Sequence, residues 1–436
     1  MVNGVDMDAS QLTAEIRKGG DKFITIKNVK GQPFSFIVVN NIPLAFREMN
    51  GVWHEATMAK LSEMTDVEFE FGWDANDLPN KATLKKMFGE NTTVIFQGDF
   101  QMDHIFNRFT QNDWKYILNN WGSIQSDLGK GILPDNLPYR WDEPDQSIKD
   151  VRSVFENPQF RAQHLLWSLW VSTDTIANVL MGLELNQSEM LKILEFMVRT
   201  RVIKYPMVNK WDVSDEIDLT QFQWNTPEEI EQQHQLEYWT ESTGTTPAKI
   251  TAIIAKWVKQ DNPDAKTYVV QAPIFDNVNP EAQWIRDGFD KFVPELAKLN
   301  ADVDYFVIEN NLWIYAQPDL NYVSNKIDWI RSYGFDIGGS ETMIVMGDEP
   351  TNPTPHRIKV NSVENPTLEQ AKMFSDWLKL YLDKEIKVFG FGGATDATAW
   401  TNVVGLENAD PLLFDDQIRA KPAYYAIVQV LYSRLP

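Results

Sequence analysis

Residues 267–310, TYVVQAPIFDNVNPEAQWIRDGFDKFVPELAKLNADVDYFVIEN, hold the pattern that decides the fold. Two apolar runs, TYVVQAPIF (267–275) and VDYFVIEN (303–310), enclose an amphipathic helical segment at 281–299. A strand, a helix and a second strand in this order predict two parallel strands joined by a helical crossover.

The same alternation extends from about residue 65 to the C-terminus. Helical segments such as 188–201, 246–260 and 367–383 lie between the apolar runs. In the last segment, Thr367 and Gln370 have the capping-box spacing, which predicts the start of a helix. The six further apolar runs are VEFEFGW (67–73), TTVIFQGDF (92–100), HLLWSLWV (164–171), VIKYPMVNKWDV (202–213), FDIGGSETMIV (335–345) and KVFGFGG (387–393). About eight strand–helix units favour an α/β fold of the closed (β/α)8 TIM barrel type over an open sheet.

The N-terminal part of the chain has a different pattern. FITIKNV (23–29), the turn-rich KGQP (30–33) and FSFIVV (34–39) predict a β-hairpin-like pair. We therefore expect residues 1–50 to form a short β segment packed on the barrel and residues 51–436 to form the barrel itself. Within the barrel, 51–112 is expected to be an insertion or strands of divergent sequence.

Composition excludes several classes of partner and cofactor. The net charge of −22 would repel nucleic acids and anionic membranes, and no apolar run is long enough to span a bilayer. The chain has no cysteine, and its five histidines are scattered without a metal-ligand spacing. We expect no metal, no cofactor, no nucleic acid and no membrane contact. The sequence carries no signal of oligomeric state.

The first ten residues, MVNGVDMDAS, have neither a basic start nor an apolar segment, so we expect no signal peptide in them. A cytoplasmic protein and a secreted protein without its signal would both fit this sequence.

Acidic residues recur where the expected strands end. They are Asp215 and Glu216, Glu309, Glu341 and Asp396. In a (β/α)8 barrel the C-terminal strand ends meet at one mouth, so such acids would become neighbours. Two carboxylates could then divide the work of cleaving a glycoside, one as acid and one as nucleophile. Each acid taken alone fits a solvated loop residue or a salt-bridge partner equally well.

Several motifs in consistent order resemble those of the family 10 glycoside hydrolases, known as endo-β-1,4-xylanases. PLLFDDQIRAKPAYYAI (411–427) is similar to the closing segment of that family. WDVSDE (211–216), GGSETMI (338–344) and TDATAW (395–400) resemble its motifs on the fourth, seventh and eighth strands, FRAQHLLW (160–167) the one on the third, and VDYFVIENNL (303–312) the one on the sixth. The resemblance runs from about residue 15 to the end and is poor over 50–112.

This resemblance implies a retaining hydrolase that acts on a β-linked polysaccharide or oligosaccharide by double displacement. Glu216 would be the acid/base and Glu341 the nucleophile. The substrate-binding residues implied by position are Asp215, Gln163, Trp167, Glu309, Asn311, Trp400, Asp127 and Lys130.

Many of these positions depart from the family pattern. Asp215 stands where the family has Asn, Gln163 where it has His, and Gly392 where it has Trp. Glu309 and Asn311 replace Gln and His, and Asp127 with Lys130 is at best a displaced form of the second-strand motif. Such changes would lower activity on ordinary xylan or change the sugar. The alternative is a catalytically degenerate barrel that binds a glycan or a protein partner.

Overall fold

The computed structural model describes the chain in segments. They are residues 13–16, 22–27, 33–39, 42–47, 53–55, 67–73, 95–98, 109–131, 148–149, 152, 159–162, 179–180, 182–214, 239–240, 242–271, 274–278, 283–347, 362–393, 395–399, 401 and 409–434.

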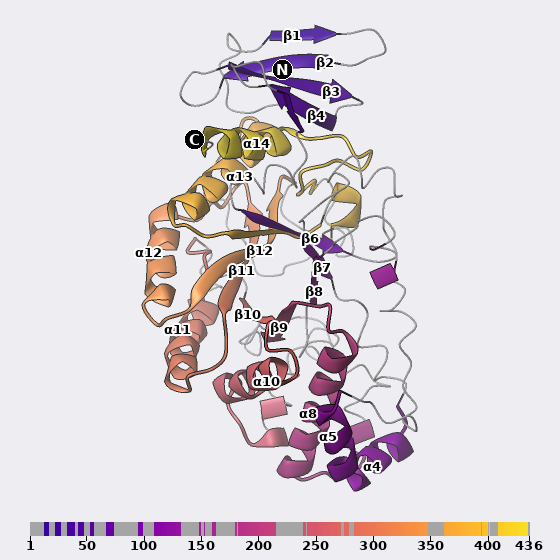
Figure 1. Cartoon of the computed structure of the whole chain (residues 1–436). Coiled ribbons are helices and arrows are strands. Elements are labelled where there is room, and N and C mark those ends of the chain that lie inside the picture. Colours follow the sequence, from indigo (N-terminus) through magenta and orange to yellow (C-terminus); the bar gives the residue numbers. More distant parts are fainter. Residues whose placement is uncertain are drawn as a thin grey trace.

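Eight parallel strands form a closed barrel in the order in which they follow one another along the chain (Figure 1). The ring closes because β13 pairs in parallel with β6, with Val388 opposite Glu68. The predicted (β/α)8 barrel is confirmed. Its strands are β6 (Glu68–Trp73), β7 (Ile95–Gly98), β8 (Gln159–Ala162), β9 (Lys210–Ser214), β10 (Lys266–Gln271), β11 (Tyr305–Trp313), β12 (Asp336–Val345) and β13 (Val388–Phe391).

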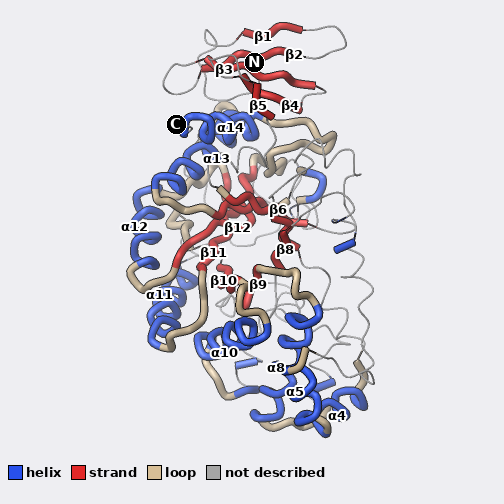
Figure 2. The backbone as a smooth tube through the Cα atoms, viewed as in Figure 1, coloured by secondary structure: helices blue, strands red, loops and turns tan. Residues whose placement is uncertain are grey.

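The described helices lie outside the strands, mainly along one side and one end of the sheet in Figure 2. They are α4 (Gln111–Asn119), α5 (Trp121–Gly129), α8 (Gln187–Lys204), α10 (Pro247–Asp261), α11 (Gln283–Lys298), α12 (Leu320–Arg331), α13 (Pro366–Asp383) and α14 (Pro422–Arg434). A short 3-10 helix, η6 (Asp396–Thr398), follows β13. The large apolar core includes the fully buried Trp114, Trp211 and Trp377.

Alternate residues of a strand face two different cores. On β10, Val269 belongs to the large core, whereas Tyr268 and Val270 form a smaller cluster with Val307 of β11. This alternation is expected for a barrel strand, whose residues point in turn to the helices and to the interior.

Two details of the sequence prediction are wrong. The run 202–213 is not one strand, because residues 202–204 end α8 and β9 begins only at Lys210. Pro206 explains the break, since a proline disfavours helical backbone in the residue before it. The N-cap of α13 lies two residues earlier than predicted: the Asn365 side chain accepts from the Leu368 amide, so Asn365 and not Thr367 is the N-cap. The run 164–171 lies outside the described residues, and the third strand precedes it.

The N-terminal residues form a second, antiparallel sheet of five strands. These are β1 (Thr13–Ile16), β2 (Lys22–Lys27), β3 (Pro33–Val39), β4 (Ile42–Arg47) and β5 (Trp53–Glu55). β2 and β3 are the hairpin-like pair that the sequence indicates. Figure 1 shows this sheet at the end of the molecule where α14 lies. Its packing on the barrel stays a prediction, as do the domain boundaries. The range 51–112 contains β6 and β7, which are the first two barrel strands.

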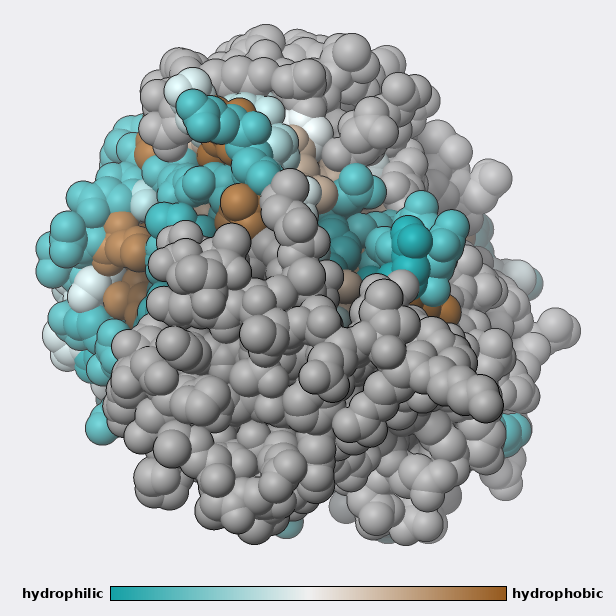
Figure 3. Space-filling model, turned by 90° about the horizontal axis from the view of Figure 1, so that it is seen from above, coloured by the Kyte–Doolittle hydropathy of each residue, from teal (hydrophilic) through white to brown (hydrophobic). Residues whose placement is uncertain are grey.

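The described residues on one face of the molecule are mainly polar. Seen from above, the described residues are mostly hydrophilic with small apolar patches between them (Figure 3). No helix in the described segments is both long and apolar enough to cross a membrane.

Candidate active site

Glu341 lies at a β-bulge in the seventh barrel strand, β12. Glu309 of β11 pairs with Ser340 and Asn311 pairs with Met343, so two steps on β11 correspond to three on β12. The same shift occurs against β13, where Gly339 pairs with Phe389 and Thr342 with Phe391. β12 therefore has one extra residue relative to both neighbours.

The backbone of Glu341 is strained at this bulge. Its φ is 44°, in the left-handed region that residues other than glycine rarely adopt. Such a conformation costs on the order of 1–3 kcal/mol and persists only where the surroundings enforce it. Glu341 is also the one residue of 337–345 that is not buried. A strained, accessible acid at a bulge is typical of a functional residue.

Glu309 and Asn311 lie on the strand next to Glu341, as the sequence predicts. Glu309 is 5% exposed and pairs with Ser340, one residue before Glu341. Asn311 is half-buried. The structure thus brings these two predicted substrate-binding residues beside the bulge, in the middle of the neighbouring strand rather than at its end.

The other half of the predicted site lies outside the described residues. Glu216, Asp215, Gln163, Trp167 and Trp400 are all in this group. Gln163 directly follows β8, which ends at Ala162. Asp215 directly follows β9, which ends at Ser214. Their roles stay predictions.

Asp127 and Lys130 do not lie on the second barrel strand, where the motif would place them. Asp127 is in α5 and Lys130 is its C-cap, whereas the second strand is β7. The two side chains are solvent-accessible, with their charged atoms 3.9 Å apart. Helix α5 packs on α4 and α8 in the outer layer. The two residues are displaced from the expected position of the second-strand motif because they belong to a helix that follows the strand.

Trp313 and the sequence candidate Asp396 have structural roles. Trp313 of β11 is 2% exposed and donates from its indole nitrogen to the Gly347 carbonyl. Asp396 accepts from the Leu412 amide at 2.7 Å and from Lys421 at 2.8 Å. Burial raises the pKa of the Asp396 carboxyl to about 6, although Lys421 opposes this shift. Asp396 therefore ties the end of β13 to the C-terminal segment.

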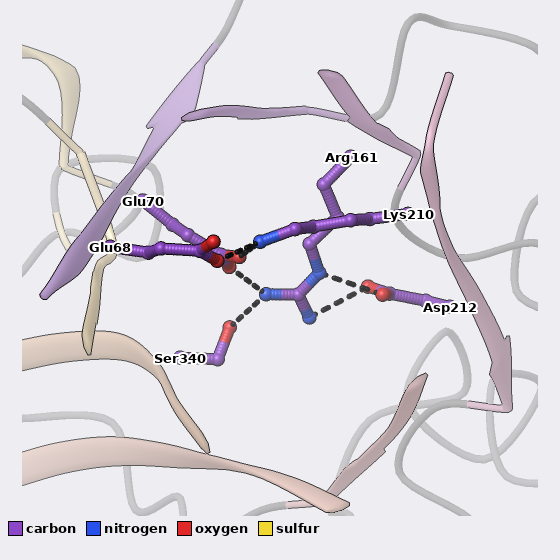
Figure 4. A network of polar contacts seen from close by, with 6 residues as sticks. All are labelled: Glu68, Glu70, Arg161, Lys210, Asp212 and Ser340. Atoms are coloured by element: carbon purple, nitrogen blue, oxygen red, sulfur yellow. Dashed lines mark hydrogen bonds and ion pairs between the residues drawn. The ribbon is translucent and has the colours of Figure 1, made fainter. Parts of the chain in front are cut away.

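A network of buried charges lies in the barrel interior (Figure 4). The Arg161 guanidinium of β8 binds both carboxylate oxygens of Asp212, at 2.7 and 2.9 Å, and Glu70 at 2.6 Å. It also donates to the Ser340 hydroxyl at 3.2 Å. Lys210 bridges Glu68 and Glu70 at 2.6 and 3.1 Å. Arg161, Glu70, Asp212 and Ser340 are fully buried.

Mutual neutralisation keeps these groups charged. Burial alone would raise the pKa of Glu70, but Lys210 and Arg161 outweigh it and hold the pKa below its usual value. Burial alone would lower the pKa of Arg161, but the Asp212 and Glu70 carboxylates outweigh burial and hold this pKa above its usual value. The Arg161 ion therefore links β6, β8, β9 and β12. Two of these strands are significant for the site, since β9 leads to Glu216 and β12 carries Glu341.

The sequence prediction missed this network because it considered acids after strands and not within them. A signal was present in the alternation of polar and apolar residues. In VEFEF, Glu68 and Glu70 alternate with apolar residues, and in KWDVS the polar Lys210, Asp212 and Ser214 do the same. In a strand of a closed barrel, such a polar face is the interior face.

Met343 occupies the space beside Gly392. A Cβ added at Gly392 would lie 2.8 Å from the Met343 Cγ and Sδ atoms. A side chain at position 392 would therefore require Met343 to move. Where the family has a tryptophan, this chain has Gly392, and the Met343 side chain of β12 occupies the space beside it.

No group of three or more His, Cys, Asp or Glu side chains that could hold a metal ion occurs in the parts of the chain that the structure describes.

Solved structures with the same fold include family members. Xylanase 10B from Thermotoga petrophila RKU-1, solved in complex with xylobiose, superposes with a TM-score of 0.61 at 18% identity and covers 88% of this chain and 100% of its own. Native xylanase 10B from Thermotoga maritima has a TM-score of 0.60 at 18% identity, with 87% and 99% covered. At these identities the likeness supports the barrel fold.

Sequence comparison identifies the family. Endo-1,4-beta-xylanase A of Halalkalibacterium halodurans is 23% identical over 323 residues, which are 69% of this chain and 75% of that protein. Residues 114–430 match the model of glycosyl hydrolase family 10. Since this match covers more than half of the chain, the protein belongs to glycosyl hydrolase family 10 and is a glycoside hydrolase.

Proposed function

We propose that this enzyme cleaves a β-linked polysaccharide or oligosaccharide with retention of anomeric configuration, using Glu341 as nucleophile and Glu216 as acid/base. The observation that carries the proposal is the backbone of Glu341, an accessible acid in a left-handed conformation at a bulge of the seventh strand. The position of Glu216, two residues after the last residue of β9, agrees with a second carboxyl group at a strand end.

The reaction has two steps. The Glu341 carboxylate attacks the anomeric carbon while Glu216 donates its proton to the leaving oxygen, which gives a glycosyl–enzyme ester and a shortened glycan. Glu216, now ionised, then takes a proton from water, and the resulting hydroxide displaces Glu341. Double displacement requires the two carboxyl groups to lie about 5–5.5 Å apart.

The substrate class follows from the relatives and from the departures. The curated relative is named as an endo-1,4-beta-xylanase, and one solved relative is in complex with xylobiose. We therefore propose a β-1,4-linked backbone of the xylan type. Glu309 and Asn311 beside the bulge, together with Gly392 against Met343, replace the residues that the family uses near the scissile bond. We propose that they adapt the site to a substituted or otherwise different sugar.

A glycan panel tests this proposal. The wild-type protein is incubated with xylan, substituted xylans, other β-glucans and aryl β-glycosides, and the anomer of the first product is followed by NMR. We expect the β-anomer first. Glu341→Gln and Glu216→Ala should each lower kcat by about 10⁴-fold, since both carboxyl groups act in the transition state.

Glu385→Gln is a matched control. Glu385 has a φ of 55°, in the same backbone region, but it is exposed in the turn between α13 and β13. It should retain full activity. An α-anomer as first product, or unchanged activity of Glu341→Gln, would show the mechanism to be wrong. Glycan binding without turnover on any member of the panel would instead indicate a catalytically degenerate barrel.

A further inference from the structure

The residues on either side of Glu341 are fixed from opposite faces of β12. Ser340 and Thr342 are both fully buried. The Ser340 hydroxyl accepts from Arg161 in the barrel interior at 3.2 Å. The Thr342 hydroxyl accepts from the Asn310 amide at 3.2 Å, and Asn310 lies on the neighbouring strand β11. One contact therefore holds the residue before the bulge and the other holds the residue after it.

The inner contact comes from a side chain that cannot easily move. Arg161 is bound to both oxygens of Asp212 and to Glu70, and all three side chains are fully buried (Figure 4). A planar guanidinium bound in this way has a fixed orientation. Ser340 thus faces the interior at a defined position.

The outer contact is fixed by a helix. The same Asn310 nitrogen donates to the Tyr381 hydroxyl at 3.1 Å, and Tyr381 is a fully buried residue of α13. Tyr381 also packs closely on β12, because a Cβ at Gly339 would lie only 2.7 Å from its Cε2 atom. Asn310 is 1% exposed, so both of its donated bonds are made away from solvent. Thr342 therefore faces the helical layer.

These contacts determine where the extra residue of the bulge lies. A strand alternates strictly between its two faces, so a shift of the bulge by one residue would turn Glu341 to the other face. The left-handed φ of Glu341 favours such a shift, because it would relieve the strain. With Ser340 held inward and Thr342 held outward, the extra residue can only be Glu341.

We propose that Arg161, Asn310 and Tyr381 are positioning residues that lock the β12 bulge and thereby aim the Glu341 carboxylate. This inference rests on the proposed role of Glu341 as nucleophile. None of the three residues needs to touch the sugar. Their effect is on the orientation of the attacking carboxylate, and hence on kcat more than on KM.

The sharpest test removes one hydroxyl and changes little else. Thr342→Val keeps the side-chain shape but cannot accept from Asn310, and Thr342→Ser keeps the acceptor. We expect Thr342→Val to lower kcat about tenfold with KM nearly unchanged, as loss of about one net hydrogen bond would do. The acid limb of the pH profile of kcat/KM should shift, because the nucleophile carboxylate has moved. Thr342→Ser should restore most of kcat, and Tyr381→Phe should behave as Thr342→Val does.

Thr251→Val is the matched control. Thr251 is a fully buried residue of α10 whose hydroxyl has no hydrogen-bond partner among the described residues. The substitution is chemically the same, but it leaves the bulge untouched, so kcat should not change. An equal fall of kcat in Thr251→Val would overturn the proposal, since general loss of packing would then explain the effect.

Crystal structures of the wild type, Thr342→Val and Thr251→Val separate this inference from the proposed function. The proposal requires that Glu341 changes its backbone conformation in Thr342→Val alone. An unmoved Glu341, or a moved Glu341 with unchanged kcat, overturns it. If Glu341→Gln is as active as the wild type, or no glycan is cleaved, the proposed function fails. The structures then still decide whether Thr342 and Asn310 lock the bulge.

Discussion

Glu341 combines an accessible carboxylate with backbone strain, and selection for stability alone would remove the strain. At a φ of 44°, a residue with a Cβ has a less stable backbone conformation than glycine would have. Only glycine has no Cβ to clash with the following carbonyl. The strain at Glu341 can therefore be measured at a single residue. This measurement requires no knowledge of the substrate.

Two substitutions at this residue separate the strain from the charge. Glu341→Ala and Glu341→Gly both remove the carboxylate, but only glycine relieves the left-handed backbone. We expect Glu341→Gly to be more stable than Glu341→Ala by about 1 kcal/mol, with both proteins inactive. Urea unfolding followed by circular dichroism measures the difference. Equal stability of the two variants would mean that the backbone at 341 is not strained in solution.

At the scale of elements, the sequence predicts regular strands well and their irregularities poorly. Six of the eight apolar runs coincide with barrel strands, the run 202–213 overlaps β9 only in its last residues, and 164–171 lies outside the described residues. Alternation and apolar content locate a strand, because they report which residues are buried. The bulge in β12 has no such signal. It depends on contacts of Ser340 and Thr342 with Arg161 and Asn310, which are distant in sequence.

A related limit explains why the fourth strand begins later than the sequence predicts. Apolar residues near 202–204 end a buried helix and not a strand, and apolarity alone does not distinguish the two. The positions of Glu341, Glu309 and Asn311 on neighbouring strands could be predicted because the motifs that carry them are local. The interior partners of Glu70 and Arg161 were not, since ion pairs across a barrel follow from its closure.

The contact of α13 with β12 gives a prediction at this scale. Gly339→Ala should destabilise the protein by about 1–3 kcal/mol, since the new Cβ would lie 2.7 Å from the Tyr381 ring. Gly122→Ala in α5 is the control, because nothing lies within 4 Å of its added Cβ. There alanine should be neutral or slightly stabilising. Midpoints of thermal unfolding compare the two variants. A Gly339→Ala protein as stable as the wild type would show that the helix and strand are not in close contact.

At the scale of the whole molecule, a charged interior replaces part of the apolar filling that barrels generally have. Two cations and three carboxylates occupy the network, and most of them are shielded from water. Such ions are stable together and costly apart. Arg161 is the centre of the arrangement, because it contacts residues of three other strands.

Removal of the Arg161 guanidinium should lower the stability of the whole barrel. Arg161→Met leaves Glu70 and Asp212 buried without the guanidinium, and we expect a loss of about 3–5 kcal/mol in the free energy of unfolding. Arg434→Met removes a solvent-exposed ion pair with Asp383 and should cost less than about 1 kcal/mol. Urea titrations give both values. A small effect at Arg161 would contradict the view that the network holds the strands together.

The closure of the ring has a consequence for how the chain is made. β6 has β7 on one side and β13 on the other, and β13 is completed only when Phe391 has left the ribosome. Until then one edge of β6 has no partner, and an unpaired edge invites association with other nascent chains. Glu68 and Glu70 lie on β6, the strand whose edge is unpaired until β13 is made. Their charges, which the finished barrel neutralises with Lys210 and Arg161, would keep the open edge soluble during synthesis.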